Sequence, residues 1–342
     1  MPDKEDFDPG LWKLLQRTWN NITSIHSYSE IYAWYNEADY AVAESYNPNE
    51  MNYFLRGLQE LGKRAANYAE IRVQEPGWPT LADALQDPDF NNLWETFYHF
   101  VKKDRKAVTK RIYVHVAEPY VEKSLELMKA LVEHLGKVKG FDAVKVAGPA
   151  AVGRKDQIIA YLTDDTSRSE ILSVLRKLSN QKTNAVLKKG APLCVKEEFP
   201  GVGIADEPPA VGDLFNEKPG QSFGKYLAQL IWFAVDEYLD AGHGKDKFLE
   251  NVQIALKTGG IDAKEPHLHA QRQSIETLNI RGKLARNKRL AHTQAATKAA
   301  TQATTQATKG AHGSRSRGKK QVVPTARGRR RRSGTNRSRR RA

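Results

Sequence analysis

Apolar residues recur three and four positions apart through the first third of the chain. This spacing places them on one face of an α-helix, and it predicts helices over 11–22, 53–71 and 91–108. A further helix is predicted to begin after Thr80, because a threonine directly before an apolar periodic segment is a typical N-cap. We therefore expect residues 1–108 to form a helical N-terminal region.

The pattern changes to alternation at residue 109. Arg111, Tyr113 and His115 fall on one face of a β-strand, and apolar residues fall on the other. A helix, two strands and a second helix follow, at 120–138, 141–149, 157–164 and 167–181. This order predicts the α+β class, with the helical N-terminal region packed on a small mixed β-sheet.

Later segments complete the predicted domain organisation. Proline and glycine dominate 191–212, which indicates loops, and two more helices are predicted at 222–242 and 248–260. We expect residues 109–280 to be an α+β region that forms one globular unit with residues 1–108. Residues 281–342 are then a separate tail.

The tail holds the basic excess of the chain. Its 20 lysines and arginines exceed the net charge of +14, so residues 1–280 carry a net charge of −6. Residues 293–309 are an Ala/Thr/Gln repeat, followed by arginine-rich runs with Gly and Ser between them. Such a segment buries too little apolar surface to fold, so we expect it to be disordered. Its charge predicts polyanion or nucleic-acid binding through phosphates, and an accessory extension without a selected role is the alternative.

Composition argues against several classes of protein. Cys194 is the single cysteine, which excludes a disulfide framework and a thiolate metal site. The start, MPDKEDFDPG, lacks the apolar core of a signal peptide, and no run approaches the roughly 18 apolar residues of a membrane span. We expect no membrane partner and a cytoplasmic location in the producing cell. No cofactor or metal motif is evident beyond the weak pair His267 and His269, so neither is expected.

One lysine occupies an unusual position. Lys145 lies in the run AVKVA, with Val144 and Val146 beside it. Burying its charge is costly unless the ammonium is paired or loses its proton. Either the ammonium reaches water past its apolar neighbours, or the strand presents it to a ligand. In the second case desolvation and nearby arginines would lower its pKa and make it a base.

Five segments in order resemble the HopA-type bacterial effector family. They are RIYVH, VKVAGPAAVGRKDQIIAYL, PGVG with DEPP, QSFG, and GGID with PHLH. The resemblance covers roughly residues 90–270. The family is named for a type III secreted protein of plant pathogens, and its relatives include the lyase component of class V lanthipeptide biosynthesis. Secretion as an effector is one role that the resemblance implies.

The family fold is similar to that of the phosphothreonine lyases, which remove phosphate from phosphothreonine by β-elimination. In those lyases a strand histidine is the general acid, and a strand lysine about thirty residues later is the general base. The resemblance assigns these roles to His115 and Lys145. Tyr113 stands where such lyases carry a lysine, and it brings a hydrogen-bond donor for phosphate but no fixed charge.

Phosphate elimination also needs positive charge around the phosphate oxygens. Arg154 and Lys155 follow a glycine turn and are candidates for this role, Arg154 with two parallel hydrogen bonds. Arg111 shares the strand face of His115 and joins them as a candidate. Asp206 and Glu207 are either surface charges or carboxylates that orient a cation near the site.

Three functions remain open from the sequence. The first is a lyase that eliminates phosphate from phosphothreonine or phosphoserine in a peptide or protein. The second is an effector-like protein that binds a phosphorylated or anionic partner without catalysis, which Tyr113 favours. The third is nucleic-acid association through the tail. The oligomeric state is left open.

Overall fold

The computed structural model describes residues 3–36, 47–74, 79–86, 96–151, 153–180, 185–208, 222–241 and 244–268. The chain separates into two compact units, residues 1–284 and 285–342, and all described residues belong to the first. The predicted disordered tail lies outside the described residues. Within the described ranges, no helix combines the length and apolar character that crossing a membrane requires.

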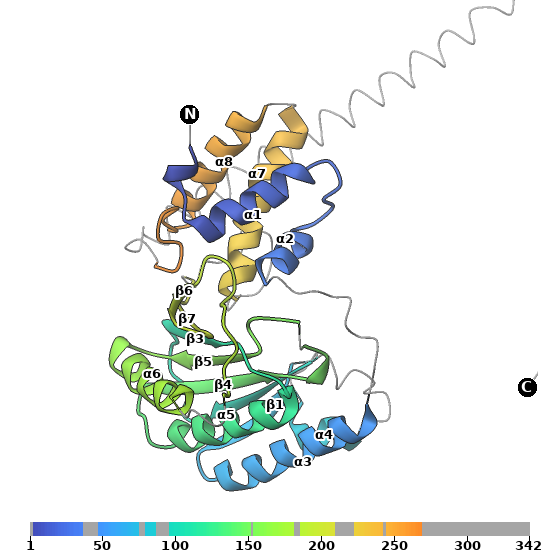
Figure 1. Ribbon diagram of the computed structural model, residues 1–342, viewed down its shortest axis with the longest axis vertical. Helices are drawn as coiled ribbons and strands as arrows, with labels where there is room; N and C mark the ends of the chain where they lie inside the picture. The colour runs from blue at the N-terminus through green and yellow to red at the C-terminus, as the bar shows by residue number, and fades with distance from the viewer. Residues whose placement is uncertain are drawn as a thin grey trace, which may run out of the picture. The chain divides into compact units, whose positions relative to one another are not determined.

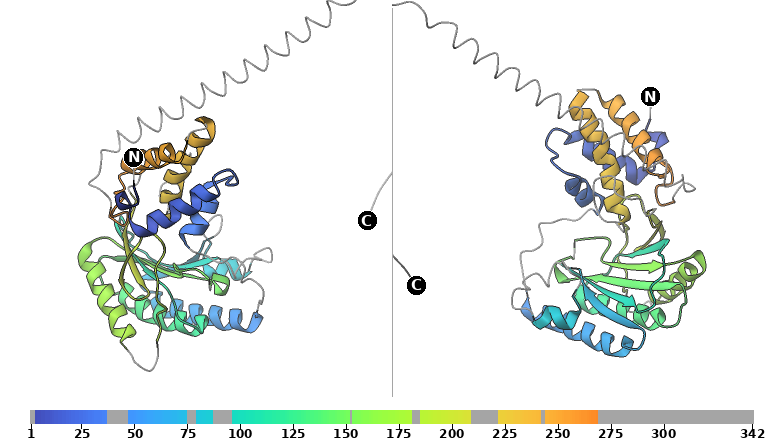
Figure 2. Two further views of the ribbon diagram at one scale, coloured as in Figure 1. Left: turned by 45° about the horizontal axis from the view of Figure 1, so that its top comes forward. Right: turned by 180° about the vertical axis from the view of Figure 1, so that it is seen from behind.

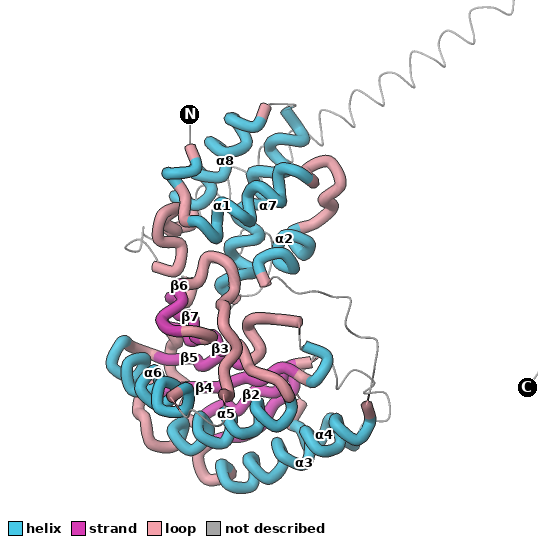
Figure 3. The backbone as a smooth tube through the Cα atoms, in the orientation of Figure 1, coloured by secondary structure: helices cyan, strands magenta, loops and turns pink. Residues whose placement is uncertain are grey.

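The first unit combines a seven-stranded sheet with eight α-helices in its described part, which confirms the α+β class (Figure 1). The strands are β1 (Ala69–Val73), β2 (Phe97–Lys102), β3 (Lys110–Val114), β4 (Phe141–Ala147), β5 (Ile158–Leu162), β6 (Lys196–Phe199) and β7 (Val202–Asp206). The helices are α1 (Pro9–Asn20), α2 (Tyr28–Tyr35), α3 (Pro48–Ala65), α4 (Leu81–Gln86), α5 (Tyr120–Leu135), α6 (Asp165–Ser179), α7 (Phe223–Ala241) and α8 (Lys245–Thr258). Figure 3 shows the strands gathered between the helices of this unit.

The sheet has the strand order β1-β2-β4-β5-β3-β7-β6, and each neighbouring pair is antiparallel. The expected mixed sheet is therefore wrong. β3 and β4 are connected through α5, as the sequence pattern predicted, but β5 lies between them and pairs antiparallel with both. A strand, helix, strand order predicts parallel strands, yet it does not show whether a later strand enters between them.

Alternate residues of the strands face two different groups of helices. Ile112 and Val114 of β3 pack in the core that includes α3, α4, α5 and α6. Tyr113 of β3, Ile159 of β5 and Ala205 of β7 point the other way and pack with α1, α2, α7 and α8. Figures 1 and 2 show the two groups of helices on opposite sides of the sheet. The second face carries the candidate site residues of β3 and β4.

Four strands lie where the sequence pattern indicated something else. α3 ends at Ala65, and β1 takes up the end of the helix predicted over 53–71. The helix predicted over 91–108 is wrong, since β2 lies within this range. Five of the six β2 residues are buried, so no alternation of polar and apolar residues marks the segment as a strand. β6 and β7 form a hairpin inside the predicted loops, and Gly201 in its turn has a φ of 82°.

Local capping explains where several predicted helices begin. Asp8 accepts hydrogen bonds from the N–H groups of Gly10 and Leu11, at 2.8 and 3.0 Å, at the start of α1. Thr80 accepts one from the N–H group of Asp83 at 3.2 Å, which confirms its predicted role at the start of α4. These side chains satisfy N–H groups that have no partner inside the helix.

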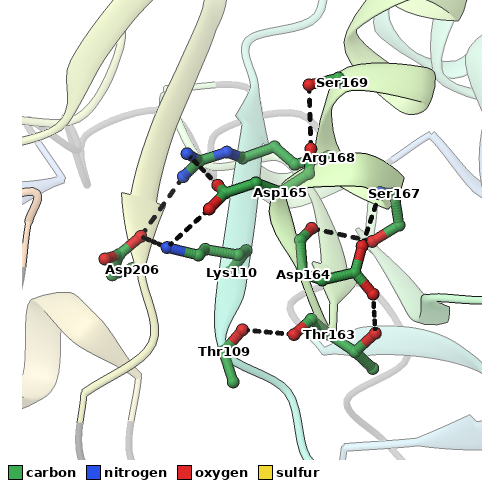
Figure 4. A network of polar contacts seen from close by, with 9 residues as sticks. All are labelled: Thr109, Lys110, Thr163, Asp164, Asp165, Ser167, Arg168, Ser169 and Asp206. Carbon is green, nitrogen blue, oxygen red and sulfur yellow. Dashed lines mark hydrogen bonds and ion pairs between the residues drawn. The ribbon is translucent and has the colours of Figure 1, made fainter.

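A charged network fastens the N-terminus of α6 to the sheet (Figure 4). Asp164 caps α6, because its Oδ1 accepts a hydrogen bond from the N–H group of Ser167 at 2.8 Å. Lys110 of β3 and Arg168 of α6 both contact Oδ1 of Asp206 on β7, at 2.9 and 3.3 Å. Asp206 is thus a carboxylate that joins two strands and a helix.

Candidate functional site

A row of residues crosses the second face of the sheet at the level of Lys145. In the strand register, His99 of β2 lies opposite Lys145 of β4. Ile159 of β5 lies opposite both Lys145 and Tyr113 of β3. Lys145 therefore lies on an inner strand of the sheet, with β2 on one side and β5 on the other.

Lys145 is buried, with 5% of its surface exposed. Its Nζ lies 3.9 Å from the centre of the Phe97 ring. Burial lowers the pKa of Lys145 from 10.5 to about 7; the carboxylate of Asp156 opposes this shift, and the guanidinium groups of Arg111 and Arg154 add to it. A substantial fraction of Lys145 is therefore a neutral amine near neutral pH. This burial argues against the first interpretation, in which the ammonium reaches water past its apolar neighbours.

Arg154 lies beside Lys145 and is held by a carboxylate. Its Nε and Nη2 donate to the two carboxylate oxygens of Asp156 at 2.8 and 2.9 Å. Its Nη2 also lies 3.5 Å from the hydroxyl of Tyr32 on α2, and its guanidinium carbon is 5.1 Å from the Phe97 ring centre. Lys145 and Arg154 thus share one aromatic ring, which attracts positive charge.

Arg111 forms the second cation–carboxylate pair of this face. Its guanidinium makes a two-pronged ion pair with Glu207, and it also lies 4.8 Å from the ring centre of Tyr161. Glu207 of DEPP thus pairs with a predicted site residue, which agrees with the alternative that a carboxylate of this segment orients a cation. The ring of Tyr161 also stacks on His99, with the two ring centres 6.4 Å apart. The pKa of His99 is lowered, mainly by burial and next by the charge of Lys145.

Tyr113 is almost fully buried under the helices of the second face. Burial raises the pKa of its hydroxyl well above the ordinary value, so the side chain is neutral and brings no charge to the site. It lies level with Lys145, since both are opposite Ile159. Any contact of Tyr113 with a phosphate would therefore be a neutral hydrogen bond.

His115 follows the last residue of β3 and lies in a second group of cations. Its Nδ1–H donates to the carbonyl oxygen of Lys189 at 3.0 Å. Burial lowers its pKa, and the charges of Lys188 and Lys155 contribute in the same direction. A Cβ atom placed on Gly190 would lie 3.5 Å from Nζ of Lys155 and 3.7 Å from Nδ1 of His115, so both groups flank this glycine.

The predicted site residues therefore form two groups on one face. Lys145, Arg111 and Arg154 influence one another electrostatically, and His115 and Lys155 lie together beyond the end of β3. β5 separates the strands of His115 and Lys145, which places these strands about 10 Å apart. A base at Lys145 and an acid at His115 would thus have to act from two sides of a substrate.

Sequence reasoning missed Phe97, His99, Tyr32 and Asp156. Phe97 and His99 were assigned to a helix, so their common face with Lys145 was not visible. Tyr32 reaches Arg154 through tertiary packing and left no local signal. Asp156 did leave one, because it stands two residues after Arg154 in the turn that joins β4 and β5.

In the described part of the chain, no three His, Cys, Asp or Glu side chains cluster as metal ligands would. His269, and with it the predicted pair with His267, lies outside the described residues. The predicted site residues supply amines, guanidinium groups and an imidazole, and these groups are suited to binding an anion.

The fold and site define an α+β protein with a buried, cation-flanked lysine at the centre of an antiparallel sheet. The chain belongs to the HopA1 effector protein family, whose model matches residues 89–268, more than half of the chain. Effector proteins are also among the similar solved structures. The effector protein from Pseudomonas syringae pv. syringae strain 61 has a TM-score of 0.57 at 20% identity, over 77% of this chain and 96% of that chain.

A second effector structure gives the same result for the fold. The effector protein from Pseudomonas syringae pv. tomato strain DC3000 has a TM-score of 0.53 at 18% identity, over 75% of this chain and 99% of that chain. At these identities the likeness concerns the fold alone. No curated protein matches the chain.

Proposed function

We propose that this HopA1-family protein is a lyase that eliminates phosphate from phosphothreonine or phosphoserine in a peptide or protein. The observation that carries the proposal is Lys145, a buried amine whose pKa is lowered to about 7 between two arginines. A general base works best when its pKa lies near the working pH. An ordinary surface lysine would be protonated and could not accept a proton.

The proposed reaction uses Lys145 as the base and His115 as the acid. The neutral amine of Lys145 removes the Cα proton, and the electron pair left behind forms the Cα–Cβ double bond. The Cβ–O bond breaks, and its electrons leave with the phosphate. His115 gives a proton to the leaving phosphate, so the products are a dehydroamino acid and inorganic phosphate. No cofactor takes part in these steps.

The cations support the departing charge. Arg154 and Arg111 flank Lys145, and Lys155 lies beside His115. Burial and the neighbouring lysines lower the pKa of His115, so the free protein holds it neutral near pH 7. A phosphate dianion beside the imidazole would reverse this effect and supply the protonated acid.

A second candidate is an effector-like protein that binds a phosphorylated or anionic partner without catalysis. Two observations favour it: Asp156 and Glu207 already occupy the guanidinium groups of Arg154 and Arg111, and Tyr113 brings no charge. The tail, with its 20 basic residues, would bind polyanions in either case. Secretion as an effector and action on a biosynthetic precursor peptide are the two settings for the lyase.

Mass spectrometry of phosphothreonine and phosphoserine peptides after incubation with the full chain tests the proposal. We expect a loss of one whole phosphoric acid, because elimination leaves a dehydroamino acid. Lys145→Met, which keeps the length of the side chain, should abolish the reaction. Lys137→Met changes an exposed lysine next to β4 and serves as the matched control.

Each outcome separates the candidates. Loss of the phosphoryl group with the hydroxyl retained would indicate hydrolysis and overturn the elimination. Unchanged peptides, with peptide binding that depends on Arg154, would favour the non-catalytic candidate. Turnover that survives in Lys145→Met would remove Lys145 from the role of base.

A further inference from the structure

A short loop, residues 186–190, wraps the end of β3 and surrounds His115. Val116 and Leu187 form an antiparallel bridge. The N–H group of Lys188 donates to the carbonyl oxygen of His115 at 2.9 Å. The carbonyl oxygen of Lys189 then accepts the Nδ1–H of the imidazole at 3.0 Å. A carbonyl oxygen can only accept, so this contact places the proton of neutral His115 on Nδ1.

Glu197 of β6 fastens this loop to the neighbouring turn. Its Oε1 accepts hydrogen bonds from the N–H groups of Gly190 and Gly201, at 2.9 and 3.0 Å. The carbonyl oxygen of Gly201 in turn accepts the backbone N–H of His115 at 2.9 Å. One carboxylate oxygen thus joins the two segments that contact the histidine.

Both glycines have backbone conformations with positive φ. Gly190 has a φ of 107° and Gly201 a φ of 82°, which other residues rarely adopt. A Cβ atom on Gly201 would lie only 2.5 Å from the carbonyl oxygen of Lys188, so the two segments touch through backbone. Two N–H groups that converge on one charged oxygen form strong hydrogen bonds and hold such an arrangement.

We propose that Glu197 is a positioning residue for His115, an inference that rests on the proposed function. Glu197 keeps the 186–190 loop in place, and the loop presents the Lys189 carbonyl to Nδ1–H. The other nitrogen, Nε2, is then the atom that carries and delivers the proton to the leaving phosphate. Glu197 touches neither substrate nor imidazole and acts through the loop alone.

The tautomer of His115 is the first readout. We would label the nine histidines of the full chain with ¹⁵N and assign His115 with a His115→Gln variant. Two-bond nitrogen–proton correlations should show the Nδ1–H tautomer in the unaltered protein. Glu197→Ala should lose this signature and show both tautomers, whereas Glu197→Gln, which keeps an acceptor oxygen, should retain it.

Glu198→Ala is the matched control, because Glu198 is the next residue and forms an ion pair with Arg176 at 3.7 Å. It should leave the tautomer unchanged. A dominant Nε2–H tautomer in the unaltered protein overturns the inference, and so does a retained Nδ1–H tautomer in Glu197→Ala. Where Glu197→Ala does not fold, the tautomer of the unaltered protein can still overturn the inference.

Kinetics on a phosphopeptide is the second readout. We expect Glu197→Ala to lower kcat about 10- to 100-fold with KM little changed, since misplacing a catalytic group affects the chemical step more than binding. Glu197→Gln should restore most of kcat, which a loss of general folding would not allow. A protein without any lyase turnover would contradict the proposed function, while the tautomer measurement would still judge the role of Glu197.

Discussion

Replacing Lys145 by methionine should stabilise the protein at neutral pH, although it removes the proposed base. Burial shifts the pKa of Lys145 from 10.5 to about 7, so folding carries a cost that an apolar side chain avoids. Each pKa unit corresponds to about 1.4 kcal/mol, and the full window corresponds to roughly 5 kcal/mol. The ring of Phe97 returns part of this cost, so we expect Lys145→Met to gain about 2–5 kcal/mol at pH 7.

The sign of the pH dependence distinguishes this effect from ordinary repacking. Between pH 7 and 10.5 the unfolded chain binds a proton at Lys145 that the folded protein does not. The free energy of unfolding of the unaltered protein therefore rises with pH in this window, and the advantage of Lys145→Met shrinks by up to about 1.4 kcal/mol per pH unit.

Urea denaturation of both proteins at pH 7, 8 and 9 measures the difference directly. Lys137→Met, at an exposed position, should show no such pH-dependent difference from the unaltered protein. A difference between Lys145→Met and the unaltered protein that stays constant across these pH values would refute the reasoning, because Lys145 would then titrate alike in both states.

Three further predictions concern the same face and the tail. Asp156→Asn should lower the free energy of unfolding by about 3–5 kcal/mol, since Asp156 is buried and the largely covered guanidinium of Arg154 loses its carboxylate partner, whereas Glu70→Gln at a half-exposed ion pair should cost at most about 1 kcal/mol; urea denaturation compares the two. Phe97→Leu removes the ring beside Lys145 and should move the acidic limb of the pH–rate profile to lower pH, and an unmoved limb would contradict a role of the ring. Truncation after Leu284 should abolish salt-sensitive binding to nucleic acid in a filter or polarisation assay and leave the circular dichroism of the first unit unchanged; binding that persists would place the polyanion site elsewhere.

Periodicity predicted most of the helices, and turn residues marked three of the strands. α1, α5, α6, α7 and α8 each keep an apolar stripe, and β3, β4 and β5 were recognised between turns. β2 was missed because the apolar residues of 91–108 recur at helical spacing, and a short apolar run without alternation fits a helix as well as a strand. The hairpin of β6 and β7 failed because its short, partly exposed strands lie among prolines and glycines.

The candidate site divides in the same way. Lys145 could be singled out from its apolar neighbours, and burial with a lowered pKa agrees with that interpretation. The register then decided which groups surround it: His99 lies opposite because β2 pairs with β4, and Phe97 lies beneath the amine. Glu207 pairs with Arg111 because β7 lies beside β3, although the two residues are 96 positions apart in the sequence.

The sequence by itself determined which residues carry charge, which lysine lies among apolar neighbours, and the family to which the chain belongs. Only the tertiary structure decided that β5 enters between β3 and β4. This insertion separates the group around Lys145 from the group around His115. The physical reason is that strand pairing depends on long-range burial and hydrogen bonding, whereas a sequence pattern reports only the faces of single elements. The same pairing brings Glu197, which no local pattern distinguishes, to the loop that holds His115.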